Sequence, residues 1–171
     1  MVTPLIKKQS LDRSVLKNYR PVSGLNFVSK LVERVVARQI KAHITSNGLD
    51  NLHQSAYKSG HSTETALLKI KSDIHLSLSQ NKPVAMVMLD LSAAFDTIDH
   101  PQLLERLKSW FGFSGTVAKW FTSHLTDRTQ SVKVNDTVSA AKGFKFGVPQ
   151  GSVLSPLVFN HSVHSFQDMP I

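Results

Sequence analysis

The stretch that most constrains the fold is VAMVMLDLSAAFDTIDH, residues 84–100. Its first part, 84–90, is an apolar run that follows Pro83 and ends on Asp90. A run of this length with such flanks favours a buried strand over a helix. Side chains alternate along a strand, so Met88 and Asp90 share one face. A carboxylate at the end of a buried strand needs a cation, a hydrogen-bonding partner or water, and strand ends are common positions for catalytic groups.

Composition limits the partners of the chain. The 171 residues suffice for one domain, and 20 Lys and Arg against 12 Asp and Glu give a net charge of +8. This excess favours a polyanionic partner, nucleic acid ahead of an anionic membrane surface, although a basic domain without such a partner stays open. The absence of cysteine excludes disulfides and thiolate metal sites. No apolar run approaches the ~18 residues of a membrane span. The N-terminus lacks a secretory signal, so we expect an intracellular protein without a membrane partner, in the cytoplasm or the nucleus.

Amphipathic periodicity predicts two helices in the first half of the chain. The first covers residues 25–45, and Asn47-Gly48 is its stop signal. Its core-facing stripe consists of residues that recur every three or four positions: Leu25, Val28, Leu31, Val32, Val35, Val36, Gln39, Ile40 and Ile44. We expect its charged side chains to lie off this stripe: Lys30, Glu33, Arg34, Arg38 and Lys41. A loop over 49–61 precedes the second helix, which starts at residue 61 or 62 and ends near 79.

Further helices follow the predicted strand. Asp99 and Pro101 mark the start of one that runs to about residue 111. Another spans 114–125, and a last one begins between 152 and 156 and covers 157–159. We expect three side chains of the 114–125 helix to face inward: Val117, Trp120 and Phe121.

Short strands complete the pattern. Residues 4–8 and 18–23 fit edge strands, because Pro21 cannot donate to a ladder. Residues 129–135 and 144–148 alternate in polarity and fit a ribbon, with a turn at the start of its connection. Helices and strands in this mixed order predict an α+β fold rather than a doubly wound sheet.

Four stretches together resemble the reverse transcriptase of non-LTR (LINE-type) retrotransposons. They are KNYRPVS (17–23), QSAYKSGHSTETA (54–66), LDLSAAFDTIDH (89–100) and GVPQGSVLSP (147–156). Each alone is a weak signal. Together they follow the order and spacing of the family over about residues 5–160, which makes the resemblance strong.

The resemblance implies a partial right-hand polymerase within the α+β class, with fingers, part of the palm and an antiparallel palm sheet. Residues 1–82 and 100–146 correspond to fingers, and 83–99 and 147–171 to palm, in a single incomplete domain. The implied activity is RNA-directed DNA polymerisation, which is template-directed nucleotidyl transfer from dNTPs. An RNA template and a DNA primer are the implied partners, and two Mg²⁺ ions are the implied cofactors.

The resemblance also assigns metal ligands. Asp90 corresponds to the catalytic, first metal-binding aspartate, and Leu91 to the residue whose backbone carbonyl faces the metal. Nucleotidyl transfer needs two divalent ions ~3.5–4 Å apart, and Mg²⁺ prefers hard oxygen ligands. We interpret Asp96 and Asp99 as turn or capping residues rather than as further ligands.

Further residues correspond to nucleotide contacts of the family. Phe95 matches the bulky residue that lies under the sugar and excludes a 2′-hydroxyl, with a core aromatic as the alternative. Gln150 and Gly151 match a turn that touches the incoming nucleotide and the template. Arg20 and Lys8 match basic residues that hold the triphosphate. Lys7 and Lys8 are not separable at this stage.

The chain departs from the family in one respect. The family's next motif contains two adjacent aspartates, and no Asp-Asp pair occurs among the 171 residues. We therefore expect a reverse transcriptase portion that is truncated before this motif and inactive as a polymerase on its own. Three alternatives remain: an active enzyme whose missing strand comes from elsewhere or from a longer reading frame, a decayed fragment without function, and a basic RNA- or DNA-binding remnant of a retroelement.

Overall fold

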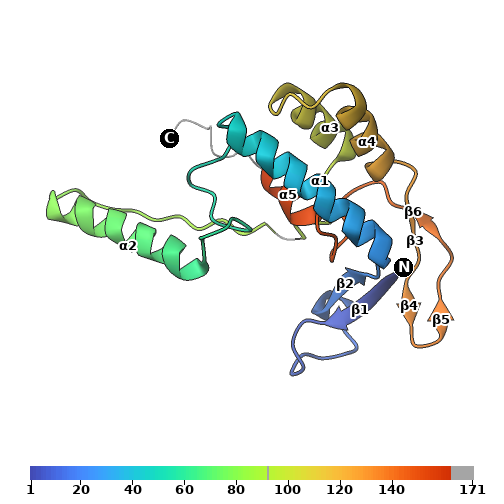
Figure 1. Ribbon diagram of the computed structural model, residues 1–171. Helices are drawn as coiled ribbons and strands as arrows, with labels where there is room; N and C mark the ends of the chain where they lie inside the picture. Colours follow the sequence, from blue (N-terminus) through green and yellow to red (C-terminus); the bar gives the residue numbers. More distant parts are fainter. Residues whose placement is uncertain (92, 163–171) are drawn as a thin grey trace. The chain divides into compact units, whose positions relative to one another are not determined.

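A computed structural model describes residues 1–91 and 93–162 (Figure 1). The chain divides into two compact units. The larger unit consists of Met1–Leu49 and Ala93–Ile171, and the smaller unit of Asp50–Ser92. Helices and short antiparallel strands occur together, as the α+β prediction states.

The larger unit begins with an antiparallel hairpin of β1 (Val2–Ile6) and β2 (Tyr19–Ser23), connected through the 3₁₀ helix η1 (Leu16–Asn18). Its register places Pro4 opposite Pro21. Neither proline has an N–H to donate, so this pair occupies a position where the ladder requires no bond. The two predicted strands are confirmed within two residues.

Four helices form the main body of the larger unit: α1 (Phe27–Ser46), α3 (His100–Ser109), α4 (Gly115–Leu125) and α5 (Ser155–Ser162). Asn26 caps α1 by accepting a hydrogen bond from the Ser29 amide. Asp99 caps α3 in the same way, as predicted, through the Gln102 amide. Figure 1 shows α3 beside α4, and α3 packs against both α4 and α5.

The core of the larger unit is assembled from several segments. Its most deeply buried side chains are Leu103, Phe121 and Leu154, which are each 1% exposed. The buried face of α1 consists of Glu33, Ala37, Ile40 and Ile44. The predicted α1 stripe is therefore wrong in its N-terminal half, where four predicted stripe residues are exposed: Val28, Leu31, Val32 and Val35. Val117 of α4 is also exposed, whereas Phe121 is buried as expected.

The strand ribbon pairs differently from the prediction. β3 (Thr129–Gln130) pairs with β6 (Lys142–Gly143), and β4 (Lys133–Val134) pairs with β5 (Thr137–Val138). The turn at residue 135 is confirmed, with Asn135 at φ 52°. Of the residues expected to complete the ribbon, 144–148, the Phe144 amide still bonds the Arg128 carbonyl beside β3, whereas 146–148 connect to 95–99.

The smaller unit contains α2 (Thr63–Ser79), which starts one residue after the predicted range of 61 or 62 and ends as predicted. Ser62 and Thr65 form a capping box at its start, and none of its residues is buried. The prediction of a buried strand over 84–90 is wrong, because these residues form no strand and all are exposed, with Leu89 at 88%. A strand needs a neighbour to satisfy its backbone groups, and no described strand pairs with this segment.

Candidate functional site

The candidate site of the larger unit forms where two motifs distant in sequence meet. The Gly147 amide donates to the Ile98 carbonyl and the Val148 amide to the Phe95 carbonyl, each over 2.7 Å. An antiparallel bridge between Asp99 and Phe146 extends this connection. Residues 95–99 are thereby fixed against the segment that leads into the turn at 149–152.

The glycine at position 147 is required by its surroundings. Its φ is +84°, and an added Cβ would lie 2.6 Å from the Phe95 carbonyl oxygen. Any side chain here would combine an unfavourable backbone conformation with a steric clash. Gly147 therefore permits the close approach of the two motifs.

Gln150 and Gly151 lie together on the turn, as predicted. The Gln150 side-chain amide donates to both carboxylate oxygens of Asp96, over 3.3 and 3.4 Å. The Gln150 backbone carbonyl accepts a hydrogen bond from the Ser23 amide at the end of β2, over 2.8 Å. Gly151 has φ +103°, and an added Cβ would lie 3.2 Å from the Ser23 carbonyl oxygen. The turn is thus held against both β2 and the segment after Phe95.

A cavity of about 450 Å³ opens beside this turn. It is lined by side chains of the hairpin, of the ribbon and of both motifs: Val2, Pro21, Ser23, Asp96, Gln130, Gly143, Phe144, Lys145, Phe146, Val148, Pro149 and Gln150. The walls combine aromatic and apolar surface with two amides, a carboxylate and an ammonium group. Such a mixture is typical of small-molecule sites, where polar groups fix the orientation of the ligand.

The remaining predicted residues of the larger unit lie at different places. Phe95 is partly buried against the core, with its ring centroid 5.0 Å from that of Phe159. Arg20 is exposed on β2, next to the cavity residue Pro21. Lys8 is exposed after β1, whereas the Lys7 ammonium donates to the Lys17 carbonyl over 2.7 Å. This difference favours Lys8 as the freer cation.

Asp90 and Leu91 belong to the smaller unit, where both are exposed in the segment without regular structure. Among the described residues, no group of three or more His, Asp or Glu side chains could hold a metal ion. The described residues therefore do not fit a two-ion site.

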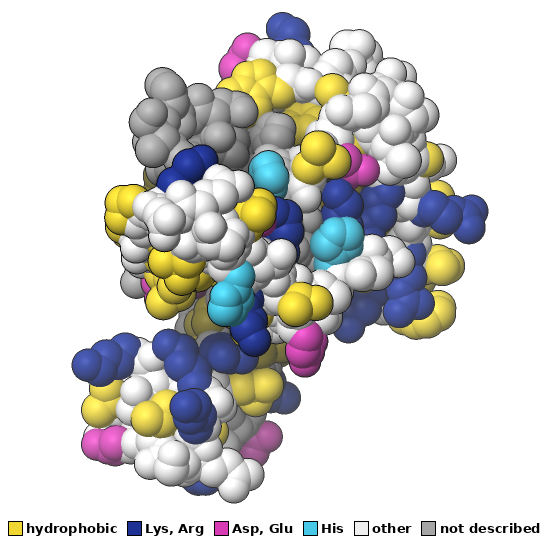
Figure 2. Space-filling model, turned by 90° about the vertical axis from the view of Figure 1, so that its left-hand side faces the viewer, with side chains coloured by type: hydrophobic (Ala, Val, Ile, Leu, Met, Phe, Trp, Pro, Cys, Tyr) yellow, Lys and Arg dark blue, Asp and Glu magenta, His cyan; other side chains and the backbone are white. Residues whose placement is uncertain are grey.

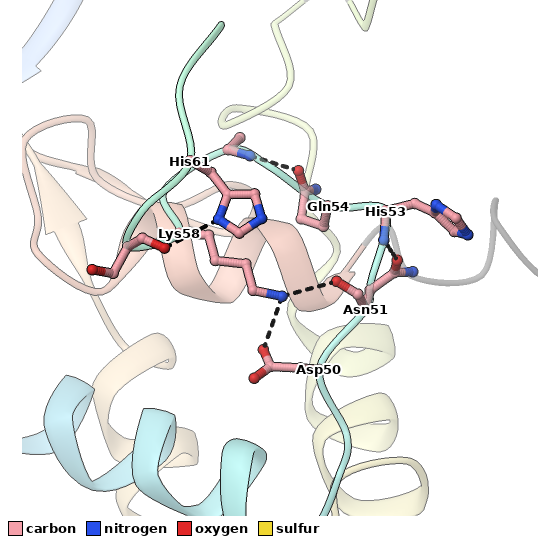
Figure 3. Close-up of polar contacts among 8 residues, drawn as sticks. Asp50, Asn51, His53, Gln54, Lys58 and His61 are labelled. Carbon is pink, nitrogen blue, oxygen red and sulfur yellow. Dashed lines mark hydrogen bonds and ion pairs between the residues drawn. The ribbon is translucent and has the colours of Figure 1, made fainter. Parts of the chain in front are cut away.

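A polar loop of the smaller unit carries the second motif (Figure 3). The Lys58 ammonium donates to the Asn51 carbonyl over 3.2 Å and lies 4.0 Å from the Asp50 carboxylate. The Gln54 side chain accepts from the Ala56 amide, and a ring nitrogen of His61 lies 3.1 Å from the Ser59 carbonyl. These contacts show a loop that is ordered by its own side chains.

Two polar residues make contacts that the sequence does not predict. Asp96 lies in a turn, as predicted, and its carboxylate also accepts a hydrogen bond from Gln150. Glu33 was placed off the apolar stripe, yet it is 3% exposed and binds Ser152 and Val153. The signal for Glu33 is its spacing, because positions 33, 37, 40 and 44 recur every three or four residues on one helical face.

Comparison with known proteins establishes the family. Residues 6–169 match the family described as Reverse transcriptase (RNA-dependent DNA polymerase). The chain is 30% identical over 158 residues to the probable RNA-directed DNA polymerase from transposon BS of Drosophila melanogaster, covering 91% of this chain and 17% of that protein. It is 30% identical over 174 residues to the corresponding protein from transposon X-element of the same organism, covering 99% of this chain and 18% of that protein.

A third relative is the RNA-directed DNA polymerase from mobile element jockey of Drosophila funebris. The identity is 29% over 153 residues, covering 90% of this chain and 16% of that protein. The chain thus spans less than a fifth of the length of each of these three curated relatives. It belongs to the reverse transcriptase family, and the resemblance to the non-LTR type is confirmed.

Proposed function

We propose that this chain provides the nucleotide- and template-binding part of an RNA-directed DNA polymerase. The observation that carries the proposal is the joined pair of segments, 95–99 and 147–152, beside a cavity of about 450 Å³ in a member of this family. Both segments contain residues that correspond to nucleotide contacts. In the right-hand architecture that we propose, 83–99 and 147–171 belong to the palm and the remainder to the fingers. Of the palm range, residues 92 and 163–171 lie outside the described part.

The individual roles follow from chemistry and position. The Gln150 side chain donates both of its hydrogen bonds to Asp96 through its amide nitrogen. Its amide oxygen therefore remains available as an acceptor toward a sugar or base. Gly151 is exposed and has no side chain, which allows close approach to the backbone. Phe95 presents an aromatic surface for the sugar. Arg20 and Lys8 supply cations for the triphosphate.

Gln150 gives the most direct test. The variant Gln150→Ala removes the amide and its bond to Asp96, and dNTP affinity should fall about tenfold or more. The measurement is a titration of the chain and an RNA–DNA template–primer with a fluorescent dNTP. Gln39→Ala is the matched control, because Gln39 is exposed on α1. Equal affinity for Gln150→Ala and wild type would reject the assigned role.

Catalysis requires metal ligands in addition to the nucleotide-binding residues. Two-ion nucleotidyl transfer requires several oxygen ligands, and Asp90 with the Leu91 carbonyl are the only positions that match the family's metal ligands. Magnesium would neutralise phosphate charge during the reaction. We propose that residues 1–171 by themselves bind substrates without extending a primer. Template-dependent extension that Asp90→Ala abolishes would contradict this.

A second function, binding of RNA or DNA without catalysis, is favoured by a basic stripe on α1. Lys30, Arg34, Arg38 and Lys41 recur at helical spacing, and the last three are exposed. Figure 2 shows Lys and Arg side chains exposed on one face of the molecule. Contacts from such residues to phosphates give affinity without reading sequence.

A further inference from the structure

Glu33 is an acidic residue buried on the core-facing side of α1, where its neighbours on the same face are Ala37 and Ile40. We propose that Glu33 is a positioning residue that fixes the turn carrying Gln150 and Gly151 in its nucleotide-binding conformation. The consequence for nucleotide binding rests on the function proposed above. The conformation of the turn can be measured independently of any ligand.

One oxygen of Glu33 makes both contacts with the turn. Its Oε2 accepts a hydrogen bond from the Ser152 hydroxyl over 2.8 Å and from the Val153 amide over 2.7 Å. These bonds join positions that are 119 and 120 residues apart in sequence. Because the acceptor is a carboxylate oxygen and the contacts are buried for Ser152 and partly buried for Val153, each bond is stronger than one between neutral groups.

The bond from Ser152 to Glu33 also determines which further hydrogen bonds the Ser152 hydroxyl can make. The hydroxyl has one hydrogen, and that hydrogen is donated to Glu33. Its lone pairs then face the amides of Leu154 and Ser155, which lie 3.1 and 3.3 Å away at the start of α5. Glu33 therefore orients the group that caps α5, and with it the end of the turn.

The other side of the turn is already held by different partners. The Ser155 hydroxyl donates to the Pro149 carbonyl over 2.8 Å, and the Ser23 amide donates to the Gln150 carbonyl over 2.8 Å. Gly151 lies between these supports and the Glu33 contacts and is exposed. Without Glu33, the Ser152 hydroxyl would lose its acceptor in a buried place and the Val153 amide would lose its acceptor in a partly buried one.

Glu33 acts through Ser152 and Val153 rather than on a ligand, because it is absent from the lining of the 450 Å³ cavity. It borders a different cavity of about 310 Å³ between α1 and α4. Since both bonds go to Oε2, a glutamine at this position has an oxygen that can accept both, with its amide nitrogen in the place of Oε1. The amide thus preserves the geometry that alanine removes.

The experiment compares Glu33→Ala, Glu33→Gln and the control Glu105→Ala in the full chain, Glu105 being exposed on α3. Amide hydrogen exchange is measured at Val153 and Ser155, with Leu103 of the core as internal reference. Fluorescent dNTP affinity is measured on the same samples with an RNA–DNA template–primer. Amide hydrogen exchange tests whether Glu33 holds the turn, and dNTP affinity tests whether this conformation of the turn supports nucleotide binding.

For Glu33→Ala we expect exchange at Val153 and Ser155 to accelerate about tenfold or more relative to Leu103, with a similar loss of dNTP affinity. Glu33→Gln should remain within about threefold of wild type in both readouts, and Glu105→Ala should match wild type. Equal acceleration at Leu103, or wild-type exchange at Val153, would overturn the proposal. Failure of the wild type to bind dNTP would reject the proposed function and the nucleotide consequence together, while exchange would still decide whether Glu33 holds the turn.

Discussion

One buried and one partly buried histidine connect distant segments of the larger unit through hydrogen bonds of their rings. His100 is buried at the start of α3, and its Nε2 lies 2.7 Å from the Gly147 carbonyl oxygen. His43 of α1 has its Nε2 2.8 Å from the Phe111 carbonyl oxygen. A carbonyl oxygen only accepts, so Nε2 carries the hydrogen in both contacts. Each imidazole thus satisfies a backbone group outside regular structure.

The close approach at Gly147 predicts a large effect of a small substitution. In Gly147→Ala the new Cβ would lie 2.6 Å from the Phe95 carbonyl oxygen at a φ of +84°. The conformation alone costs about 1–3 kcal/mol of unfolding free energy, and the clash adds to this cost. Denaturant unfolding measures the difference. The control is Gly48→Ala, with φ +64° and nothing within 4 Å, which should show the conformational cost alone; equal losses in the two variants would argue against the clash.

His124 of α4 predicts a dependence of stability on pH. Burial lowers its pKa from the ordinary 6.5, Glu33 opposes this shift and Arg128 adds to it. The unfolded state then binds the proton more readily, so this contribution to stability is complete above pH 6.5 and is lost as the pH falls through the lowered pKa.

Unfolding free energy measured between pH 5 and 8 tests whether stability falls on acidification, as the lowered pKa of His124 predicts. Wild type should lose more stability on acidification than His124→Asn does. His75→Asn, at an exposed position of α2, serves as control and should follow the wild type. A steeper loss in His124→Asn would show that the sign is wrong.

At the scale of elements, the helices differ in what supports them. α1, α3 and α4 each bury residues in the core, whereas α2 buries none. Helices of this length are marginal without tertiary packing. Local interactions therefore contribute a larger share of the stability of α2. These are the Ser62–Thr65 capping box and the Lys69–Asp73 ion pair.

Removal of the cap should consequently weaken α2 selectively. Ser62→Ala deletes the acceptor for the Thr65 amide, and the expected loss is about 0.5–2 kcal/mol of helix stability. Amide exchange over Thr63–Ser79 measures it. Ser72→Ala, in the exposed middle of α2, should have the opposite effect because alanine has the higher helix propensity. Unchanged exchange in Ser62→Ala would contradict the importance of the cap.

At the scale of the whole molecule, the excess of positive charge is the main property. The net charge is +8, and three exposed cations of α1 lie on one side of the helix: Arg34, Arg38 and Lys41. None of the helices within residues 1–91 and 93–162 is long and apolar enough to cross a membrane. The excess of positive charge favours association with a polyanion.

The double variant Arg34→Gln/Arg38→Gln tests the stripe. Affinity for single-stranded RNA should fall, and the slope of log K against log salt should flatten by about 0.7 for each lost phosphate contact. Fluorescence anisotropy at several salt concentrations measures both. Lys69→Gln/Lys71→Gln on α2 removes the same charge and should have a smaller effect; an equal effect would indicate that net charge alone decides binding.

The sequence by itself determined the family, the positions of the helices and several of their caps. Asp99 caps α3 as predicted, and Ser62, one of the two residues expected to open α2, caps that helix, because capping depends on residues within one turn. Only the tertiary structure decided the burial of Glu33, the bond between Asp96 and Gln150, the pairing of the ribbon and the lack of a strand over 84–90. The physical reason is that a strand or a buried carboxylate is stable only with its partner, and here each partner is supplied by, or missing from, a segment remote in the chain.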